Sequence, residues 1–245
     1  MAFTQMKSII PILHPYDWDT TFAQLDAWLH FGTQPWQWLA PLLLNGPIVS
    51  IITVIYTGIW FLACFGTLTY AALDINRPQA RMQFILSYFA CWSIMGTFAA
   101  IIFSSVGPVY FQHFGTPSNL YQPLTEQLRL LDAQGWFTPV FAIDLVWNAS
   151  QSKNIAMSGL GISAMPSLHV AMGCLIYLYA RTFGPIARLI SGAFFGMIFV
   201  GSVLLGWHYA IDSYAAIFGT VIIWKAAGWV SKMTLKARAP AISGI

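Results

Sequence analysis

The chain has 245 residues, of which 58% are hydrophobic and only 8% are charged. Soluble domains carry about 25% charged residues, so this composition excludes an ordinary soluble domain and predicts an all-α integral membrane protein. The net charge of +3 comes from basic residues near the ends of apolar stretches, which excludes nucleic acid as a partner.

The N-terminal part of the chain mixes tryptophans, acids and prolines, as in DWDTTFAQLDAWLHFGTQPWQWLAPLLLNGP. This pattern favours one or two short helices that lie in the membrane interface. The first 25 residues contain acids and prolines where a signal peptide needs an unbroken apolar core, so no signal peptide is predicted. We therefore expect residues 1–46 to form an interfacial N-terminal segment.

Five apolar stretches are predicted to cross a hydrocarbon layer of ~30 Å. They lie at residues 47–73, 84–106, 165–181, 186–206 and 209–230. A sixth span is possible if residues 36–73 fold as two crossings. The spans make up one membrane domain, residues 47–232, which is followed by a tail at residues 233–245. Cys64, Cys91 and Cys174 fall inside apolar stretches without metal-ligand spacing, so neither a disulfide nor a zinc site is expected.

Basic residues cluster in alternate connections between these spans. Eight of the eleven follow the first span, separate the third from the fourth, or lie near the end of the chain: Arg77, Arg81, Arg181, Arg188, Lys225, Lys232, Lys236 and Arg238. Because basic residues concentrate on the cytoplasmic side, the C-terminus is predicted to be cytoplasmic. The loop at residues 107–164 is then extracytoplasmic, on the periplasmic or lumenal side, and we expect helices in it near 120–132 and 139–147.

The stretch GISAMPSLHVAMG, residues 161–173, contains a histidine at the start of the third span. Pro166 and Ser167 are typical of a helix N-terminus, where unpaired N–H groups and the helix dipole attract an anion such as phosphate. His169 lies in the predicted first turn of that helix. We expect His169 to face the bound group and Ser167 to contribute to phosphate binding.

A second histidine lies in GWHYAID, residues 206–212, where the fourth span leads into the fifth. His208 and Asp212 are four residues apart and share one face if the segment is helical. A carboxylate bonded to one imidazole nitrogen leaves the other nitrogen free to act as base or nucleophile. Because the third span descends from His169 and the fourth returns to His208, both histidines are expected at one level of the membrane. Two such histidines fit phosphoryl transfer, one attacking phosphorus and the other protonating the leaving oxygen.

MPSLHVA and GWHYAID resemble the Pro-Ser-x-His and His-Tyr-x-x-Asp elements of the type 2 phosphatidic acid phosphatase superfamily, in the branch of inositol phosphorylceramide synthases. The resemblance covers residues 161–216 most strongly. It implies a bundle of five to six transmembrane helices, a phosphohistidine on His208, Asp212 as its partner, His169 as general acid, and neither metal nor other cofactor.

Two phosphate-binding elements of the superfamily's phosphatases have no counterpart here. The arginine six residues before the second histidine is replaced by Ser202, and Arg77 with its following proline lies on the predicted cytoplasmic side. Lys153 is the first candidate to substitute for these cations and Arg129 the second. This departure fits the synthase-like branch better than the phosphatases.

The leading hypothesis is a lipid phosphotransferase that moves a phosphoryl or phospho-head-group from a phospholipid donor to a lipid or small alcohol. The alternative is a lipid phosphate or polyprenyl diphosphate phosphatase, and a third is a non-catalytic lipid-binding or transport protein. Tyr110 and Tyr209 are candidate head-group contacts, although tyrosines at this depth are commonly interfacial anchors. His14, His30 and His113 have no partner at useful spacing and are assigned no role. The donor, the acceptor and the oligomeric state stay open.

Overall fold

The computed structural model describes residue 10 and residues 12–114, 119–151 and 162–238, a part of the chain in which there are helices but no strands. Four helices are long and apolar enough to cross a membrane, and two apolar helices are shorter, of which Leu168–Phe183 packs with these four to make a bundle of five. In chain order, the first consists of α4 (Gly46–Val54), η1 (Ile55–Ile59) and α5 (Trp60–Leu73), and the second of α6 (Pro78–Ala90), η2 (Cys91–Ala99) and α7 (Ala100–Ile102). The third consists of α10 (Leu168–Ala180) and η5 (Arg181–Phe183). The fourth is α11 (Pro185–Leu204) and the fifth is α12 (Ala210–Arg238). The fold class expected from the sequence is thus confirmed.

The second of these helices differs from its predicted bounds of 84–106. It begins at Pro78 because proline suits the first position of a helix, and its opening turns include the charged Arg81, which a search for uncharged stretches leaves out. Its last turn ends at Ile102, where Phe103 leaves the helical conformation. The helix therefore starts six residues earlier than expected and ends four residues earlier.

The run from residue 36 to residue 73 crosses once. α3 (Pro35–Leu43) has nine residues and is about 14 Å long, too short for the hydrocarbon layer. Asn45 then caps a new helix by accepting a hydrogen bond from the Ile48 N–H at 3.2 Å, and this helix continues for 28 residues. The two-crossing alternative is therefore not the arrangement found.

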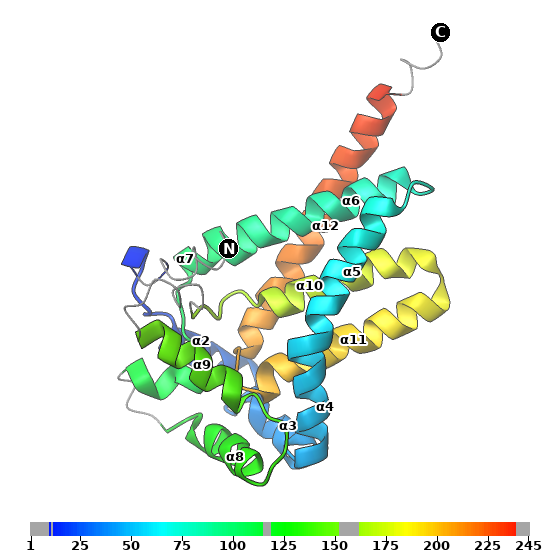
Figure 1. Ribbon diagram of the computed structural model, residues 1–245. Helices are drawn as coiled ribbons and strands as arrows, with labels where there is room; N and C mark the ends of the chain where they lie inside the picture. Colours follow the sequence, from blue (N-terminus) through cyan, green and yellow to red (C-terminus); the bar gives the residue numbers. More distant parts are fainter. Residues whose placement is uncertain (1–9, 11, 115–118, 152–161, 239–245) are drawn as a thin grey trace.

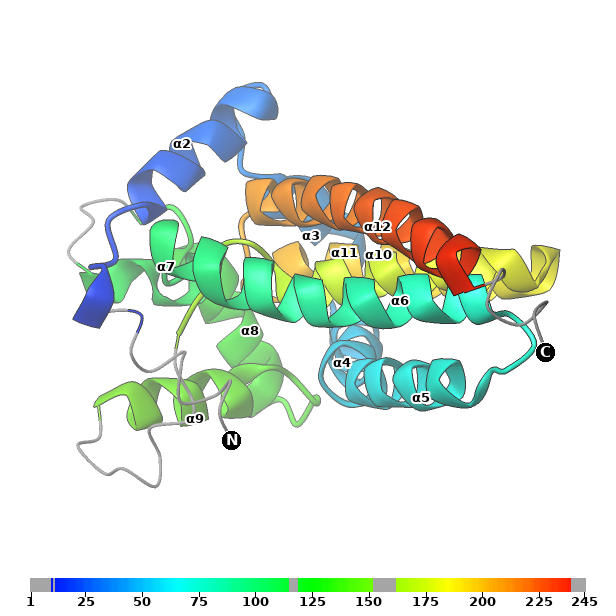
Figure 2. The same ribbon diagram turned by 90° about the horizontal axis from the view of Figure 1, so that it is seen from above.

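The shortest of the five helices, α10, lies inside the bundle and packs against α5, α6, α11 and α12 (Figures 1 and 2). Ten of its thirteen residues are buried, which is why this helix carries no lipid-facing stripe. Glycine allows α11 to come close to η1, because a Cβ on Gly201 would meet Ile52 at 2.9 Å and Tyr56 at 3.1 Å. The position of α10 places its first turn between several helices.

One end of the bundle holds the connections that carry most basic residues. Arg77, between α5 and α6, forms an ion pair with Asp74 at 3.0 Å and lies 3.5 Å from the centre of the Phe183 ring after α10. Tyr179 near the end of α10 donates to Asp74 at 3.3 Å. Since α10 rises about 20 Å, Arg77 is separated from the start of that helix by roughly this length. Arg77 therefore lies at the opposite end of the bundle from His169, as the sequence analysis expects.

The other end is covered by short helices, which we call the cap. They are α2 (Asp19–Leu29), α3, η3 (Pro108–Phe114), α8 (Gln122–Ala133) and α9 (Val140–Gln151). In Figure 1 α2, α3, α8 and α9 lie at the end of the bundle that is away from the projecting end of α12. α8 and α9 confirm the two helices expected in the 107–164 loop, and α2 and α3 confirm those expected in the N-terminal segment.

A close backbone approach joins the cap to the turn between α11 and α12. The Val109 N–H donates to the Gly206 carbonyl at 3.0 Å, and a Cβ on Gly107 would meet the Trp207 carbonyl oxygen at 2.5 Å. Gly107 also has φ +84°, a conformation that favours glycine.

Gly107→Ala is expected to lower the free energy of unfolding by about 2 kcal/mol or more, because a strained φ and a backbone clash combine. Thermal unfolding of the purified protein in detergent measures this effect. Gly66→Ala in α5 is the matched control, since a Cβ there meets nothing within 4 Å. Equal melting temperatures for the two variants would contradict the role given to Gly107.

Candidate active site

His208 lies in the turn that connects α11 to α12 and not in a helix, contrary to the helical geometry assumed for GWHYAID. α11 ends at Leu204, Gly206 has φ +75°, and α12 begins at Ala210. Asp212, in the first turn of α12, folds back over this turn. Its Oδ2 accepts a hydrogen bond from the Tyr209 N–H at 3.0 Å and lies 3.4 Å from His208 Nδ1. The expected pair thus forms because the carboxylate caps its own helix, as in a capping box.

The His208–Asp212 pair is buried. The exposed fraction is 7% for His208 and 0% for Asp212. A carboxylate taken out of water at this depth needs partners to offset its desolvation, and the Tyr209 N–H and the His208 ring supply two. A carboxylate beside Nδ1 orients the ring so that Nε2 is left for chemistry.

His169 is the second residue of α10. Ser167 is the N-cap, with an extended backbone and a buried hydroxyl that accepts from the Val170 N–H at 3.4 Å. This confirms the helix start predicted from Pro166 and Ser167 to within two residues. The N-terminus of α10 and the imidazole of His169 therefore lie together, which is the arrangement expected for binding an anion.

The two histidine motifs meet in space. The Ser167 N–H donates to the Asp212 carbonyl at 3.3 Å, which joins the start of α10 to the first turn of α12. The ring centres of His169 and His208 are 6.5 Å apart, with the ring planes inclined at 53°. Both histidines thus lie at one level, as expected from the lengths of the third and fourth spans.

Two aromatic rings from the first membrane helix lie against the imidazole of His169. The ring centre of Tyr56 is 4.3 Å away and that of Trp60 is 4.0 Å away, both stacked, and Trp60 Nε1 donates to the His169 carbonyl at 3.1 Å. Tyr56 belongs to η1, a π-helical turn, and Trp60 follows it directly. Because a π turn has more residues than an α turn, it brings residues four apart closer to one line along the helix. Such turns are frequent at functional sites.

The buried face of α2 brings two carboxylates to the turn between α11 and α12, which carries His208. Asp19 accepts from the N–H groups of Val106 and Gly107 at 3.0 Å and from the Tyr209 hydroxyl at 2.8 Å. Asp26 accepts from the first two N–H groups of α12, those of Ala210 at 2.7 Å and Ile211 at 2.8 Å. Asp19 is 5% exposed and Asp26 1%. Neither residue is among the site residues predicted from the sequence, although acidic residues stand out in a segment with few charges.

A family model described as the PAP2 superfamily matches residues 20–226, which include most of α2, the whole bundle up to α12, and both histidine motifs. The chain belongs to the PAP2 superfamily. Membership indicates phosphatase or phosphotransferase chemistry. No curated protein and no solved structure matches the chain.

Ser202 stands six residues before His208, where the resemblance to the phosphatases leads us to expect an arginine. Ser202 is fully buried in α11, and its hydroxyl lies 2.9 Å from that of Ser213 in α12. The Ser202 carbonyl accepts from the His208 N–H at 3.0 Å. The serine therefore supports the turn that carries His208, and a long cationic side chain has no room at this site without repacking.

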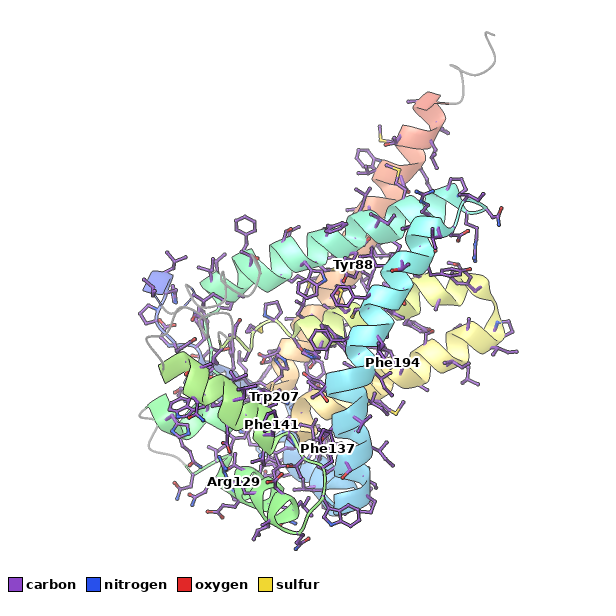
Figure 3. The ribbon with its side chains drawn as sticks, in the orientation of Figure 1. Tyr88, Arg129, Phe137, Phe141, Phe194 and Trp207 are labelled. Carbon is purple, nitrogen blue, oxygen red and sulfur yellow. The ribbon has the colours of Figure 1, made fainter. Side chains whose placement is uncertain are left out.

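Arg129, a candidate phosphate ligand, is paired within the cap. Its guanidinium makes two hydrogen bonds to Asp144, of 2.8 and 3.3 Å, and both side chains are about half exposed. Arg129 and Tyr110 line a cavity of about 420 Å³ between η3, α8 and α9. In Figure 3 Arg129 lies on α8, and Trp207, next to His208, lies nearer to the bundle. Lys153, the first candidate, lies outside the described residues.

The two candidate head-group tyrosines are both used within the fold. The Tyr110 hydroxyl donates to the Ile143 carbonyl at 2.9 Å, and that of Tyr209 donates to Asp19. Tyr110 nevertheless makes an edge contact with Trp207, with ring centres 6.4 Å apart. Tyr209 and Ser167 therefore lie with the histidines, whereas Tyr110 and Arg129 lie with the cap cavity.

His30 has partners, so the expectation that it has none at useful spacing is wrong. Its Nδ1 lies 2.7 Å from the Asp26 carbonyl oxygen and its Nε2 lies 2.8 Å from the Tyr214 hydroxyl. The first partner is four residues away on α2, and the second is 184 residues away on α12. Only the folded chain brings the second partner into reach. His30 therefore ties the end of α2 to α12.

Burial dominates the electrostatics of the α2 carboxyl groups. It raises the pKa of Asp26 to about 6, aided by the nearby Asp212, while the Ala210 and Ile211 N–H groups act in the opposite direction. Burial also raises the pKa of Asp19. Because the folded pKa of Asp26 exceeds its ordinary value of 3.8, its contribution to stability falls as the pH rises from about 4 to about 6. Above this pH window, the raised pKa of Asp26 corresponds to a loss of about 3 kcal/mol in the free energy of unfolding. At neutral pH the Asp26 carboxylate therefore costs stability.

Within the described residues, no group of three or more His, Cys, Asp or Glu side chains is arranged to hold a metal ion. The three cysteines are free and buried, as expected for small core residues. Metal-independent chemistry stays a prediction from the family resemblance.

Proposed function

We propose that this member of the PAP2 superfamily is a lipid phosphotransferase that moves a phosphoryl or phospho-head-group through a phosphohistidine on His208. One observation carries the proposal. The buried pair of His208 and Asp212 lies 6.5 Å, between ring centres, from His169 at the N-terminus of α10. A nucleophile with an orienting carboxylate, a second imidazole and a helix N-terminus are the groups that phosphoryl transfer without other cofactors requires.

The reaction has two balanced steps. In the first, His208 Nε2 attacks phosphorus, the bond from phosphorus to the lipid alcohol breaks, and protonated His169 gives its proton to the leaving oxygen. In the second, His169 takes the proton of an acceptor hydroxyl, whose oxygen attacks phosphorus while the bond to His208 breaks. His169 ends protonated, ready for the next donor. Asp212 holds the His208 ring throughout and stabilises positive charge on it.

The aromatic surroundings of His169 suit its role as the acid of the first step. The faces of Tyr56 and Trp60 lie about 4 Å from the imidazole centre. The two stacked rings hold the imidazole in place at the start of α10, and aromatic faces are compatible with a neighbouring cation. The Trp60 hydrogen bond to the His169 carbonyl also fixes the first turn of α10.

Transfer to an alcohol is favoured over hydrolysis by the burial of the site. His208 is 7% exposed, and the cap covers this end of the bundle. A covered phosphohistidine meets water less often, which favours attack by a bound hydroxyl. The buried Ser202 in place of the expected arginine also distinguishes this chain from the phosphatases and fits the inositol phosphorylceramide synthase-like branch. Lipid phosphatase activity, with water as acceptor, is the second candidate because it needs the same two histidines.

The side of the membrane follows from the distribution of charge. The basic connections beside Arg77 and Arg181 lie at the end of the bundle opposite to His169. By the positive-inside rule, we infer an active site on the extracytoplasmic side and a cytoplasmic C-terminus. The substrates are accordingly lipids of the outer leaflet.

The proposal is tested by lipid mass spectrometry on the purified protein with mixed phospholipid donors and with inositol, glycerol and ceramide as acceptors. New head-group lipids are expected with the wild type and not with His208→Ala. Release of phosphate or of a soluble phospho-head-group without a transferred product would identify a phosphatase. No product from any donor with folded wild type would contradict both enzymatic functions.

A further inference from the structure

The helix α2 reaches the active site through one buried face. Asp19, Phe22, Ala23 and Asp26 make up this face, and the two carboxylates bond to segments that are distant in sequence. Asp26 is 184 residues from Ala210, and Asp19 is 190 residues from Tyr209. Helix α2 therefore joins the N-terminal segment to the turn that carries His208.

We propose that Asp26 is a positioning residue for the reaction, which holds the first turn of α12 and through it the Asp212–His208 pair. The inference rests on the proposed function, in which His208 is the nucleophile. Asp26 touches neither histidine ring in the contacts described above, and it acts through the backbone of Ala210 and Ile211.

The hydrogen bonds at the start of α12 give the physical reason. A helix begins with N–H groups that have no partner within the helix. Here Asp26 accepts from Ala210 and Ile211 with separate oxygens, and Asp212 accepts from Tyr209. The carboxylate that orients His208 thus sits in a helical turn whose own position is set by a second carboxylate. A displacement of about 1 Å at this turn is enough to lower a catalytic rate by roughly 100-fold.

Asp19 holds the other side of the same turn. It accepts from the Tyr209 hydroxyl and from the N–H groups of Val106 and Gly107, so it links the turn to the segment that follows the second membrane helix. Tyr209 is consequently fixed at its backbone by Asp212 and at its hydroxyl by Asp19. His208 precedes Tyr209 directly, so both anchors bear on its position.

The charged and titratable groups around Asp26 come from three elements. Asp212 and Tyr214 face it from α12, Tyr121 from the segment before α8, and His30 from the end of α2. Burial raises the pKa of Asp26 to about 6, so the carboxylate that accepts both N–H groups is present at neutral pH. An asparagine side chain at this position keeps one oxygen that can accept a hydrogen bond. Its NH₂ group takes the place of the other oxygen and points a donor at the second backbone N–H group.

The test uses the full-length protein with Asp26→Asn, and Asp17→Asn as the matched control because the Asp17 side chain is 61% exposed on the same segment. Transfer kinetics give kcat and KM, and ¹³C-labelled histidine gives the NMR titration of the His208 ring, assigned with His208→Gln. We expect a 10- to 100-fold lower kcat, a KM within twofold, and a shifted His208 titration in Asp26→Asn alone. An unchanged kcat and His208 titration in folded Asp26→Asn would overturn the proposal.

A second variant keeps the test decisive if Asp26→Asn does not fold. If Asp26→Asn gives no cooperative unfolding, Asp26→Glu keeps the charge and moves it by one methylene, and a lower kcat with a shifted His208 titration again supports the proposal. The NMR arm does not depend on turnover. An inactive wild type whose His208 titration still responds to Asp26→Asn would overturn the proposed function and leave the positioning role standing.

Discussion

His208→Ala is expected to lower the rate of head-group transfer by about 10⁴-fold or more, because removing a nucleophile removes the covalent route itself. The wild type incubated with a donor labelled with ³²P in its phosphate should carry label on the protein. That label should be lost in acid and stable in base, as a phosphorus–nitrogen bond is, and peptide mapping should place it on His208. His208→Ala should carry no label while it keeps the melting temperature of the wild type within a few degrees.

His113→Ala is the control for the loss of a histidine. His113 stacks on Trp147 in the cap, with ring centres 4.0 Å apart, and lines the cap cavity. The variant should label and turn over like the wild type within a few-fold. Label on a residue other than His208, or a folded His208→Ala with wild-type turnover, would contradict the assignment of the nucleophile.

The histidine motifs are readable from the sequence because their geometry is local. Ser167 and His169 belong to one helix start, and His208 and Asp212 are four residues apart, so spacing alone indicates contact. The helices that connect them have nearly the lengths that the apolar stretches predict, and this places both motifs at one level. The family match to the PAP2 superfamily agrees with that interpretation.

The contacts that hold these motifs are long-range, and no spacing indicates them. Asp19 and Asp26 find their partners 87 to 190 residues away, and Trp60 bonds to His169 over 109 residues. An acid in an interfacial helix is usually solvated, so the N-terminal segment gives only a composition signal before folding. The π turn at Tyr56 is also not predicted from the sequence, and it lies where Gly201 lets α11 approach the first membrane helix closely.

The phosphate-binding candidate Arg129 shows the same contrast between local features, which the sequence indicates, and long-range contacts, which it does not. Arg129 is on the expected side of the bundle, and its position in α8 is close to that predicted. Its pairing with Asp144 is not visible in the sequence, because fifteen residues and a turn between α8 and α9 separate them. The alternating basic residues predict which end of the bundle holds Arg129, whereas its electrostatic partner depends on how two short helices pack.

His169→Gln is expected to slow the first chemical step by about 10²- to 10³-fold with a natural lipid donor, whose leaving oxygen needs a proton. A donor with a p-nitrophenolate leaving group needs no such proton. In a single-turnover experiment the variant should therefore release p-nitrophenolate at a rate within about tenfold of the wild type.

The difference between the two donors is the informative quantity, because a variant that is merely misfolded loses both activities together. His14→Gln is the control, since His14 lies near the chain end with Asp17 as its neighbour at 3.6 Å. His169 also has to remove the acceptor proton in the second step, so the steady-state rate of His169→Gln should stay low with either donor while the first turnover recovers with the activated one. Equal losses in the first turnover with both donors would show that His169 does not protonate the leaving group.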